Sequence, residues 1–505
     1  MLVILIIIFA AMGSGEKPIA LTVEPQRDVL IYMPSAFKLL DVTSDLALRS
    51  GALNDEQKKN LETIHTYRAY GLGLFFPSFE TSAAVDLPAN EASNPSGVVA
   101  FRYGRLARIF TYLTMGSKNP YQRTPSDERL WRFGTTAAVQ FGETYKVTPK
   151  SGVNPFEDDG DCLLAMIARP ERIEGRLRVS ASPLMDQMHI PWPVTELKMV
   201  LKSIENEGFL LHGDASFRAE KVSGLAQRTL STGPMPSLAE RFVTNDTVLA
   251  AGWVSPSASE VTDMMTEFIP DDKFLRTNYT FGMNALRSEL SSCAGPRAAV
   301  VVYTQRDVKM PPGYSGVLFA QELSQPDKIA SSLPGLLRSI TQEIVEEGNP
   351  APAQYPYFVH MSPAPGLPQA YVYHCEMMRP SECYQPVILV YKDMLIYASS
   401  PGTLAQALSG GGTDSEKALI RLRFMNTSDL GWQQLERVYG YLKAEYLATR
   451  NGKETLNDAT NYDEMFQQVQ RVLKLFDSVD ISVAGNTSGS LTFDAKFRLA
   501  AVKKE

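Results

Sequence analysis

The sequence predicts an α+β protein with two related halves, each a mainly antiparallel sheet with covering helices, and an extra helical pair in the second half. Three observations support this prediction. Short apolar segments of strand length alternate with amphipathic helical segments, a set of segments recurs in the same order, and the C-terminal region has period-two patterning. A chain of 505 residues also fits two domains better than one core.

The internal repeat rests on five short segments that recur in the same order. Their spacing stays nearly constant over the first four pairs and increases before the last, which predicts an insertion in the second half. The pairs are 28–32 with 246–250, 71–76 with 298–303, 96–98 with 315–317, 163–177 with 395–408, and 214–218 with 494–498.

Beyond the first 15 residues, these matches predict that the chain consists of two repeats joined by a linker. We expect a first α+β repeat at residues 24–221, a linker at residues 222–241 and a second α+β repeat at residues 242–502. The linker is expected because Thr232 to Pro236 interrupts the periodicity with Gly and Pro. The helical insertion near residues 430–478 carries two apolar stripes at helical spacing, which are typical of core packing.

The end of the second half predicts a β-hairpin. Residues 480–484 and 490–499 alternate apolar and polar side chains, and the Gly-rich segment 485–489 joins them. Alternation indicates a sheet with one buried face, which favours antiparallel pairing over a doubly wound parallel sheet.

The N-terminus carries an unbroken apolar run from Leu2 to Met12. A bilayer-spanning helix needs about 20 apolar residues, so this shorter run is typical of a signal peptide, although no Lys or Arg precedes it. We therefore expect residues 1–15 to be a signal peptide or a short anchor, and the protein to be periplasmic or extracellular. Residues 2–12 would make the only membrane contact if they are not cleaved. The alternative is a buried first strand.

The charge of the chain bears on its partners. The net charge is -7, and no dense run of Lys and Arg occurs, so nucleic acid is not an expected partner. An envelope protein or an apolar small-molecule ligand remains compatible with this composition.

Four cysteines are present. Cys375 and Cys383 flank a short polar segment that could join two strands, so in an oxidising compartment they are candidates for a disulfide. Cys162 and Cys293 are far apart in the sequence, and we expect both to be free buried thiols.

The remaining motifs carry little chemistry. His360 and His374 lie near the Cys375–Cys383 pair, but their spacing matches no zinc finger or ribbon, so no metal is assigned. Ser35 and Lys38 form a Ser-x-x-Lys pattern without the companion Lys-Thr-Gly of penicillin-recognising enzymes, and a helix start explains it more simply. The sequence contains no HExxH, P-loop or Gly-x-Ser-x-Gly motif. Catalytic residues stay unknown and no cofactor is expected.

The repeated unit resembles a group of exported bacterial proteins with no assigned activity. The resemblance rests on an Asp-x-x-Leu/Ile strand, on the strand-to-helix step from Ser400-Pro401 to Leu404, and on the closing hairpin. It covers most of the chain after the leader. It implies an envelope-located, duplicated α+β protein and supplies no catalytic residues.

Three functions follow as hypotheses. The first is a non-catalytic envelope protein that binds a partner or acts as a scaffold, with a carrier of an apolar ligand as its variant. The second is a hydrolase whose site is assembled from distant residues, which a polar cleft would favour. The third is a structural surface protein, which would self-assemble. A smooth apolar cavity would favour the carrier.

Overall fold

The computed structural model describes about half of the chain. The described residues are 28–49, 55–69, 80–86, 96–102, 121–123, 129–133, 136–141, 162–170, 194–204, 208–218, 220, 222, 224–254, 288–289, 292–304, 315–335, 359–364, 367–375, 387–410, 416–425, 466–467, 470–471 and 474–500. The expected leader at residues 1–15, the segment 71–76, Cys383 and most of the expected helical insertion lie outside them.

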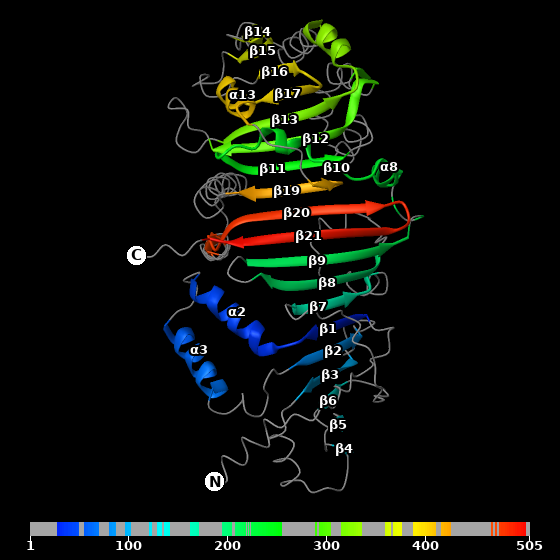
Figure 1. Ribbon diagram of the computed structural model, residues 1–505, viewed down its shortest axis with the longest axis vertical. Coiled ribbons are helices and arrows are strands. Elements are labelled where there is room, and N and C mark those ends of the chain that lie inside the picture. Colours follow the sequence, from blue (N-terminus) through cyan, green and yellow to red (C-terminus); the bar gives the residue numbers. More distant parts are fainter. Residues whose placement is uncertain are drawn as a thin grey trace, which may run out of the picture. The chain divides into compact units, whose positions relative to one another are not determined.

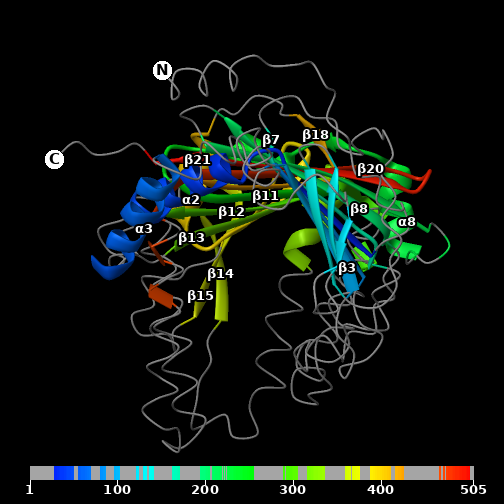
Figure 2. The same cartoon turned by 90° about the horizontal axis from the view of Figure 1, so that it is seen from below.

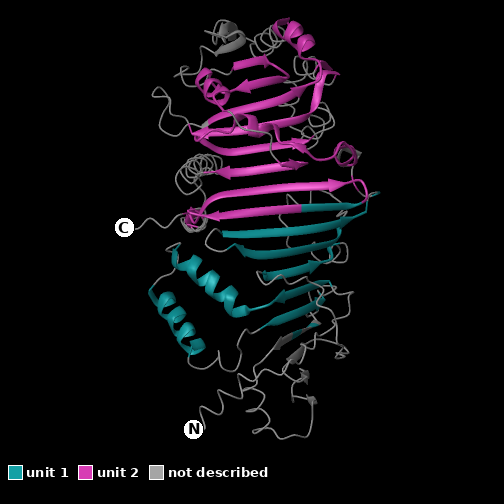
Figure 3. Ribbon diagram, viewed as in Figure 1, with its two compact units in different colours: residues 1–221, 489–492 teal, residues 222–488, 493–505 magenta. Residues whose placement is uncertain are grey.

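The fold is mixed α+β, dominated by antiparallel sheet with few helices, as the sequence predicts. All strand pairings with an assigned register are antiparallel. The chain divides into two compact units (Figure 3). Unit 1 comprises residues 1–221 with 489–492, and unit 2 comprises residues 222–488 with 493–505.

The sheet of unit 1 extends in both directions from its first strand, β1 (Val29–Met33), as Figure 1 shows. On one side β1 pairs with β2, and the pairing continues through β3, β6, β5 and β4. On the other side it pairs with β7, followed by β8 and β9. These strands are β2 (Thr81–Asp86), β3 (Ser96–Arg102), β4 (Tyr121–Arg123), β5 (Arg129–Phe133), β6 (Thr136–Phe141), β7 (Cys162–Ala168), β8 (Val194–Ile204) and β9 (Gly208–Phe217).

Two helices follow β1 and lie side by side in both views (Figures 1 and 2). In α2 (Ala36–Arg49), Phe37 and Ser44 are buried, whereas α3 (Asp55–Tyr67) buries no residue. α3 is connected to α2 through polar contacts, because Arg68 forms an ion pair with Asp41 and places its guanidinium 4.8 Å from the Phe37 ring centroid. Among the described helices, none is long and apolar enough to cross a bilayer.

Unit 2 is also built around the first strand of its large sheet, β11 (Thr247–Val254). On one side β11 pairs with β12, and the pairing continues through β13, β17, β16, β15 and β14. On the other side it pairs with β19, which pairs with β20. These strands are β12 (Ala294–Thr304), β13 (Ser315–Leu323), β14 (Val359–Ala364), β15 (Leu367–Cys375), β16 (Val387–Tyr391), β17 (Met394–Ala398), β19 (Ile420–Met425) and β20 (Phe476–Asn486).

The predicted C-terminal hairpin is confirmed and is longer than the sequence indicates. It consists of β20 and β21 (Ser490–Leu499), with a turn at residues 487–489. The N–H of Ala500 donates to the carbonyl of Leu475 at 2.8 Å, and the ring centroids of Phe476 and Phe497 lie 5.6 Å apart. Phe476 therefore begins a strand. The sequence pattern instead predicts that the helical insertion continues to about residue 478.

One face of the unit 2 sheet, which we call the inner face, carries the main core. A row of register partners crosses it, namely Ala250, Val301, Leu318, Ala398 and Val387. The same cluster includes Leu238 and Phe242 of the 3-10 helix η3 (Leu238–Phe242) and Leu404 and Ala407 of α13 (Pro401–Leu408). Because every one of these side chains is nearly inaccessible, the inner face carries the larger of the two hydrophobic clusters described in unit 2.

The strand-to-helix step before α13 is present as expected. Ser400 is the N-cap, its hydroxyl accepts a hydrogen bond from the N–H of Thr403 at 3.1 Å, and Pro401 occupies the first helical position. A capping serine followed by proline is a favourable start because both satisfy or remove backbone donors that have no partner in the helix.

The expected linker contains regular structure. Residues 222–241 include α8 (Gly224–Thr232), β10 (Met235–Pro236) and most of η3. β10 pairs with β18 (Lys417–Ala418), and the division between units falls between Lys221 and Val222. The chain therefore enters unit 2 through ordered elements that contribute to its core.

Three of the predicted segment pairs fall on strands that have corresponding places in the two units, and one pair does not. Segments 28–32 and 246–250 fall on β1 and β11, segments 96–98 and 315–317 begin β3 and β13, and segments 214–218 and 494–498 lie on β9 and β21. Segments 163–177 and 395–408 fall on β7 and β17, which have different places, because β7 pairs with β1 whereas β17 pairs with β13.

Tyr303 gives unit 2 an expected sensitivity to alkaline pH. Its ring is buried and its hydroxyl donates to the carbonyl of Phe242 at 2.8 Å, and burial raises the pKa of the phenol. In the unfolded chain the phenol of Tyr303 has a pKa of about 10. The stability that the neutral, buried phenol contributes is therefore fully present below about pH 10 and is lost as the pH rises toward its higher folded-state pKa. Urea unfolding at pH 8, 10 and 11 should show a smaller alkaline loss for Tyr303→Phe than for the wild type. Equal losses would contradict this prediction.

Candidate functional site

The candidate site is the face of the unit 2 sheet opposite to η3, which we call the outer face. Register partners share a face and neighbours along a strand alternate, so the register defines the set. Its described side chains are Leu249, Ala251 and Trp253 of β11, Ala298, Val300, Val302 and Thr304 of β12, Val317, Phe319, Gln321 and Leu323 of β13, Leu395 and Tyr397 of β17, Ile420, Leu422 and Phe424 of β19, and Asp477, Val479, Ile481 and Val483 of β20.

This set is mostly apolar, and part of it is accessible to solvent. Val317 is 37% exposed, Ile420 is 50% exposed and most of the other apolar members are partly exposed, whereas Ala298, Gln321, Leu323 and Leu395 are buried. Among these described side chains, Asp477 at the β20 edge carries the one formal charge. An antiparallel sheet with one face in water normally presents polar side chains there, so a contiguous apolar face indicates a surface that something else covers.

One end of the outer face shows what such a cover does. The helix at residues 326–335 places Ile329 and Leu333, four residues apart, against Leu323 and Leu395. All four side chains are buried, and Leu323 and Leu395 belong to the outer-face rows of β13 and β17. The same rows become exposed at Val317 on β13. Among the described residues, the outer face is therefore buried where this helix covers it and exposed at Val317 and Ile420.

Two aromatic side chains lie near the middle of the outer face. The ring centroids of Trp253 and Phe319 are 6.4 Å apart, with the rings tilted by 46°. Tilted aromatic pairs at this separation are mutually attractive, and Trp is the residue type most often found to dominate binding energy at interfaces.

The inner face carries the alternative candidate, a set of ion pairs on η3. Glu240 accepts a hydrogen bond from Arg423 at 2.6 Å and lies 3.7 Å from Arg421, which in turn donates to Asp480 at 2.8 Å. Burial alone would lower the pKa of the Arg421 guanidinium. The hydrogen bond to Asp480 and the negative charges of Asp480 and Glu240 outweigh burial and raise that pKa. The four residues form one charge network that joins η3 to β19 and β20.

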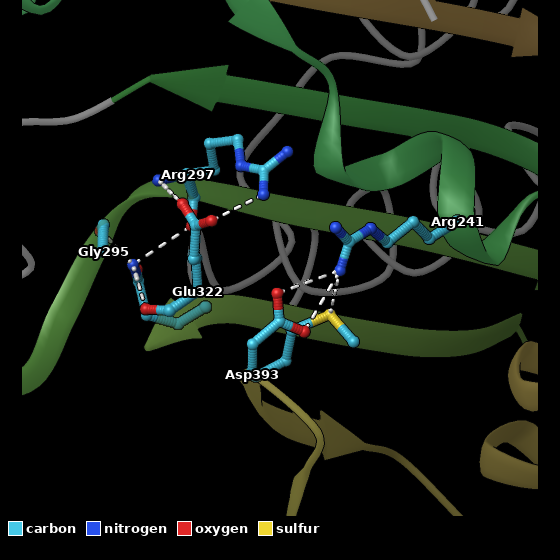
Figure 4. A network of polar contacts seen from close by, with 7 residues as sticks. Arg241, Gly295, Arg297, Glu322 and Asp393 are labelled. Atoms are coloured by element: carbon cyan, nitrogen blue, oxygen red, sulfur yellow. Dashed lines mark hydrogen bonds and ion pairs between the residues drawn. The ribbon is translucent and has the colours of Figure 1, made fainter. Parts of the chain in front are cut away.

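A second group of ion pairs begins at the next residue of η3, and Figure 4 shows it. Arg241 pairs with Asp393 at 3.2 Å, and Arg297 of β12 pairs with Glu322 of β13 at 2.5 Å. A Cβ at Gly295 would lie 2.6 Å from Cγ of Glu322, so glycine leaves room for the Glu322 side chain to pass over this bulged strand. Glu240 and Arg241 therefore join η3 by ion pairs to β19 and to Asp393, which precedes β17.

These ion pairs are suited to structure rather than catalysis. Each carboxylate faces an arginine, and arginine keeps its proton, so neither member of a pair is arranged as a nucleophile with an adjacent base. Within the described part of the chain, no group of three or more His, Cys, Asp or Glu side chains could hold a metal ion. The outer face is therefore the stronger candidate.

The residues singled out from the sequence are placed as follows. Cys375 ends β15 while Cys383 lies outside the described residues, so the Cys375–Cys383 disulfide stays a prediction. Cys162 and Cys293 are buried thiols, as expected. His360 and His374 are direct register partners across β14 and β15, a placement that their sequence spacing did not suggest.

The Ser-x-x-Lys pattern is a helix start. The hydroxyl of Ser35 accepts a hydrogen bond from the N–H of Lys38 at 3.1 Å, and the carbonyl of Ser35 accepts from Leu39. A serine that satisfies a free N–H in the first turn is the usual N-cap arrangement, so capping accounts for this residue.

Comparison with known proteins adds no constraint to this picture. The chain matches no protein-family model, no curated protein and no solved structure. A function must therefore be argued from the geometry of the site.

Proposed function

We propose that this protein is a non-catalytic binding protein of the cell envelope, and that the outer face of unit 2 binds the apolar surface of a protein partner. The observation that carries the proposal is the mostly apolar face around Trp253 and Phe319, with Val317 and Ile420 exposed on it. Burial of apolar area yields about 25 cal/mol per Å², so this face favours association with another apolar surface.

A protein partner fits this face better than an enclosed ligand does. Sites for small molecules are concave and bury most of the ligand, whereas a row such as Ala251, Val300, Phe319 and Tyr397 runs across neighbouring strands of an open sheet. Sheets of this kind are covered by helices or by another sheet. The carrier of an apolar small molecule is therefore the alternative that the experiments must separate.

The location in the envelope rests on the apolar run from Leu2 to Met12. If this run is a signal peptide, the intact mass of protein made in an exporting host should lack about the first 13 to 15 residues. A full-length mass would instead support a retained anchor or a buried strand. The same spectrum, recorded with and without reductant after thiol alkylation, would show whether one disulfide is present.

We also propose that units 1 and 2 arose by duplication of one α+β unit. The order of pairing around the first strand supports this, since β3, β2, β1, β7 and β8 follow one another as β13, β12, β11, β19 and β20 do. The face beside the first strand is also apolar and partly exposed in both units. The corresponding rows, in matching strand order, are Ile31, Met166 and Met199 in unit 1 and Ala251, Leu422 and Ile481 in unit 2.

The binding surface can be tested with an apolar dye. The dye ANS becomes fluorescent on exposed hydrophobic surface, and we expect the folded wild type to enhance its fluorescence. A lysine at position 420 places a charge in the open part of the face, so Ile420→Lys should lower this enhancement at least about two-fold. The measurement is a dye titration at fixed protein concentration.

Leu48→Lys supplies the matched control, because Leu48 on α2 of unit 1 is also 50% exposed. The control should keep the wild-type fluorescence. If Leu48→Lys removes the signal and Ile420→Lys leaves it intact, the outer face of unit 2 is not the binding surface.

A further inference from the structure

We infer that His360 of β14 and His374 of β15 form a binding site for one divalent transition-metal ion of the class that includes Zn²⁺ and Cu²⁺. This inference does not depend on the proposed function. In the order of pairing, β14 and β15 lie beyond β16, and neither strand carries a residue assigned to the outer face. The inference rests on strand pairing, which brings together two histidines that are separated in the sequence.

The register of β14 and β15 is the first argument. His360 and His374 are direct partners in this antiparallel pair. The register is regular at the positions next to both histidines, and its shift lies further along, between Pro363 and Ala364. Direct partners share a face of the sheet, and their Cβ atoms lie about 4.5–5.5 Å apart. The backbone therefore holds the two histidines opposite one another.

The chemistry of imidazole is the second argument. Neutral imidazole is the commonest metal ligand in proteins, and it binds zinc at about 2.0–2.1 Å. Two imidazoles whose Cβ atoms are about 5 Å apart can each place one nitrogen at that distance from a single ion. Nitrogen ligands favour zinc, copper and nickel, whereas magnesium and calcium prefer oxygen. The pair therefore selects a transition metal.

The sequence spacing did not indicate this site, because zinc fingers and ribbons take their ligands from short local motifs. Here the two ligands come from facing positions of two strands, so only the register reveals them. Two protein ligands leave coordination positions for water, unlike the four protein ligands of a closed structural zinc site. The site therefore binds an exchangeable ion.

The neighbouring cysteine is a separate matter. Cys375 follows His374 directly, and thiolates also bind these metals. Neighbours along a strand alternate between faces, so Cys375 and its partner Val359 belong to the face opposite the histidine pair. The predicted Cys375–Cys383 disulfide would also leave no thiolate at this position. The site therefore consists of the two histidines without Cys375.

The test is a calorimetric titration of the purified full chain with Zn²⁺, after a chelator has been used and then dialysed away. The wild type should bind one ion at this site. His360→Ala and His374→Ala should each raise the dissociation constant at least about 10-fold, because even the loss of a group that only supports a metal ligand costs about 10–100-fold. Circular dichroism without metal checks that both variants fold.

Two variants serve as controls. His212 of β9 is also a strand histidine, but its register partner is Val200, so His212→Ala should leave the dissociation constant unchanged. Cys375→Ser should leave it unchanged as well. If Cys375→Ser weakens zinc binding as much as His374→Ala does, the site is built on the thiolate and the inference is wrong.

A second measurement identifies the ligands directly. Electron paramagnetic resonance of Cu²⁺ bound to the Cys375→Ser chain should show two coordinated imidazole nitrogens, and one after the further change His360→Ala. Zn²⁺ should also raise the urea midpoint of the wild type more than that of either histidine variant, because an ion that binds the folded chain stabilises it. Absence of zinc binding by the wild type, or binding that both histidine variants retain, would overturn the inference.

Discussion

Glu240→Ala is expected to lower the free energy of unfolding of unit 2 by about 3–5 kcal/mol. Glu240 is almost fully buried and accepts the short hydrogen bond from Arg423 while facing Arg421. Its removal leaves the buried Arg421 and the partly exposed Arg423 to share Asp480, so two positive charges face one carboxylate. The loss follows from the unbalanced charge at Arg421, whose side chain is 12% exposed, and exceeds what a surface ion pair contributes. Urea unfolding followed by circular dichroism measures it.

The neighbouring residue on η3 supplies the control. Arg241 pairs with Asp393, and their side chains are 34% and 43% exposed. Arg241→Met should therefore cost less than about 1 kcal/mol. The double variant Glu240→Ala with Arg423→Met should recover part of the stability, because it removes one of the stranded charges. Equal losses for Glu240→Ala and Arg241→Met would show that the ion pairs of Glu240 and Arg241 do not differ as described.

Leu318→Ala should cost about 2–5 kcal/mol. Leu318 is completely buried on the inner face of β13, with Val301 and Ala398 as its register partners. The substitution leaves a cavity in a sheet whose backbone is held on both sides and cannot collapse easily. The measurement is again urea unfolding, carried out at a concentration at which the protein is monomeric.

Val317→Ala on the same strand is the matched comparison. Val317 points to the outer face, so its truncation should change the unfolding free energy of the monomer by less than about 1 kcal/mol. Under the proposed function, Val317→Ala acts on binding at the outer face, and Leu318→Ala acts on folding. If Val317→Ala destabilised the monomer as much as Leu318→Ala, the outer face would be a second core and not an open surface.

The sequence predicted the parts of the fold that depend on local pattern. Alternation identified the hairpin of β20 and β21, and the Ser400-Pro401 step identified the start of α13. The open outer face could not be predicted in this way. Leu249, Ala250 and Ala251 are all apolar, so the sequence of β11 is typical of a strand buried on both faces. The structure shows instead that Ala250 is buried on one face while Leu249 and Ala251 are partly exposed on the other.

The ion pairs of η3 were missed for a related reason. Glu240 and Arg423 are 183 residues apart, and nothing local marks them as partners. The segment Leu238–Phe242 could have indicated a buried charged pair, because apolar residues enclose Glu240 and Arg241. It directly follows the Pro and Gly residues from which a linker was predicted. The false match of β7 with β17 has the same origin. Both are short apolar strands followed by proline, and they differ only in their pairing partners.

The central position of β11 has a consequence for the order in which the chain is made. β12 and β19 occupy its two sides, and about 165 residues separate the end of β11 from the start of β19. At synthesis rates of about 5–20 residues per second, roughly 10 to 30 s pass before β19 emerges. During that time one edge of β11 presents unpaired backbone groups beside apolar side chains, the state most prone to wrong strand pairing. A holding chaperone would therefore raise the yield of folded protein most if it acted on the chain between the synthesis of residues 254 and 420.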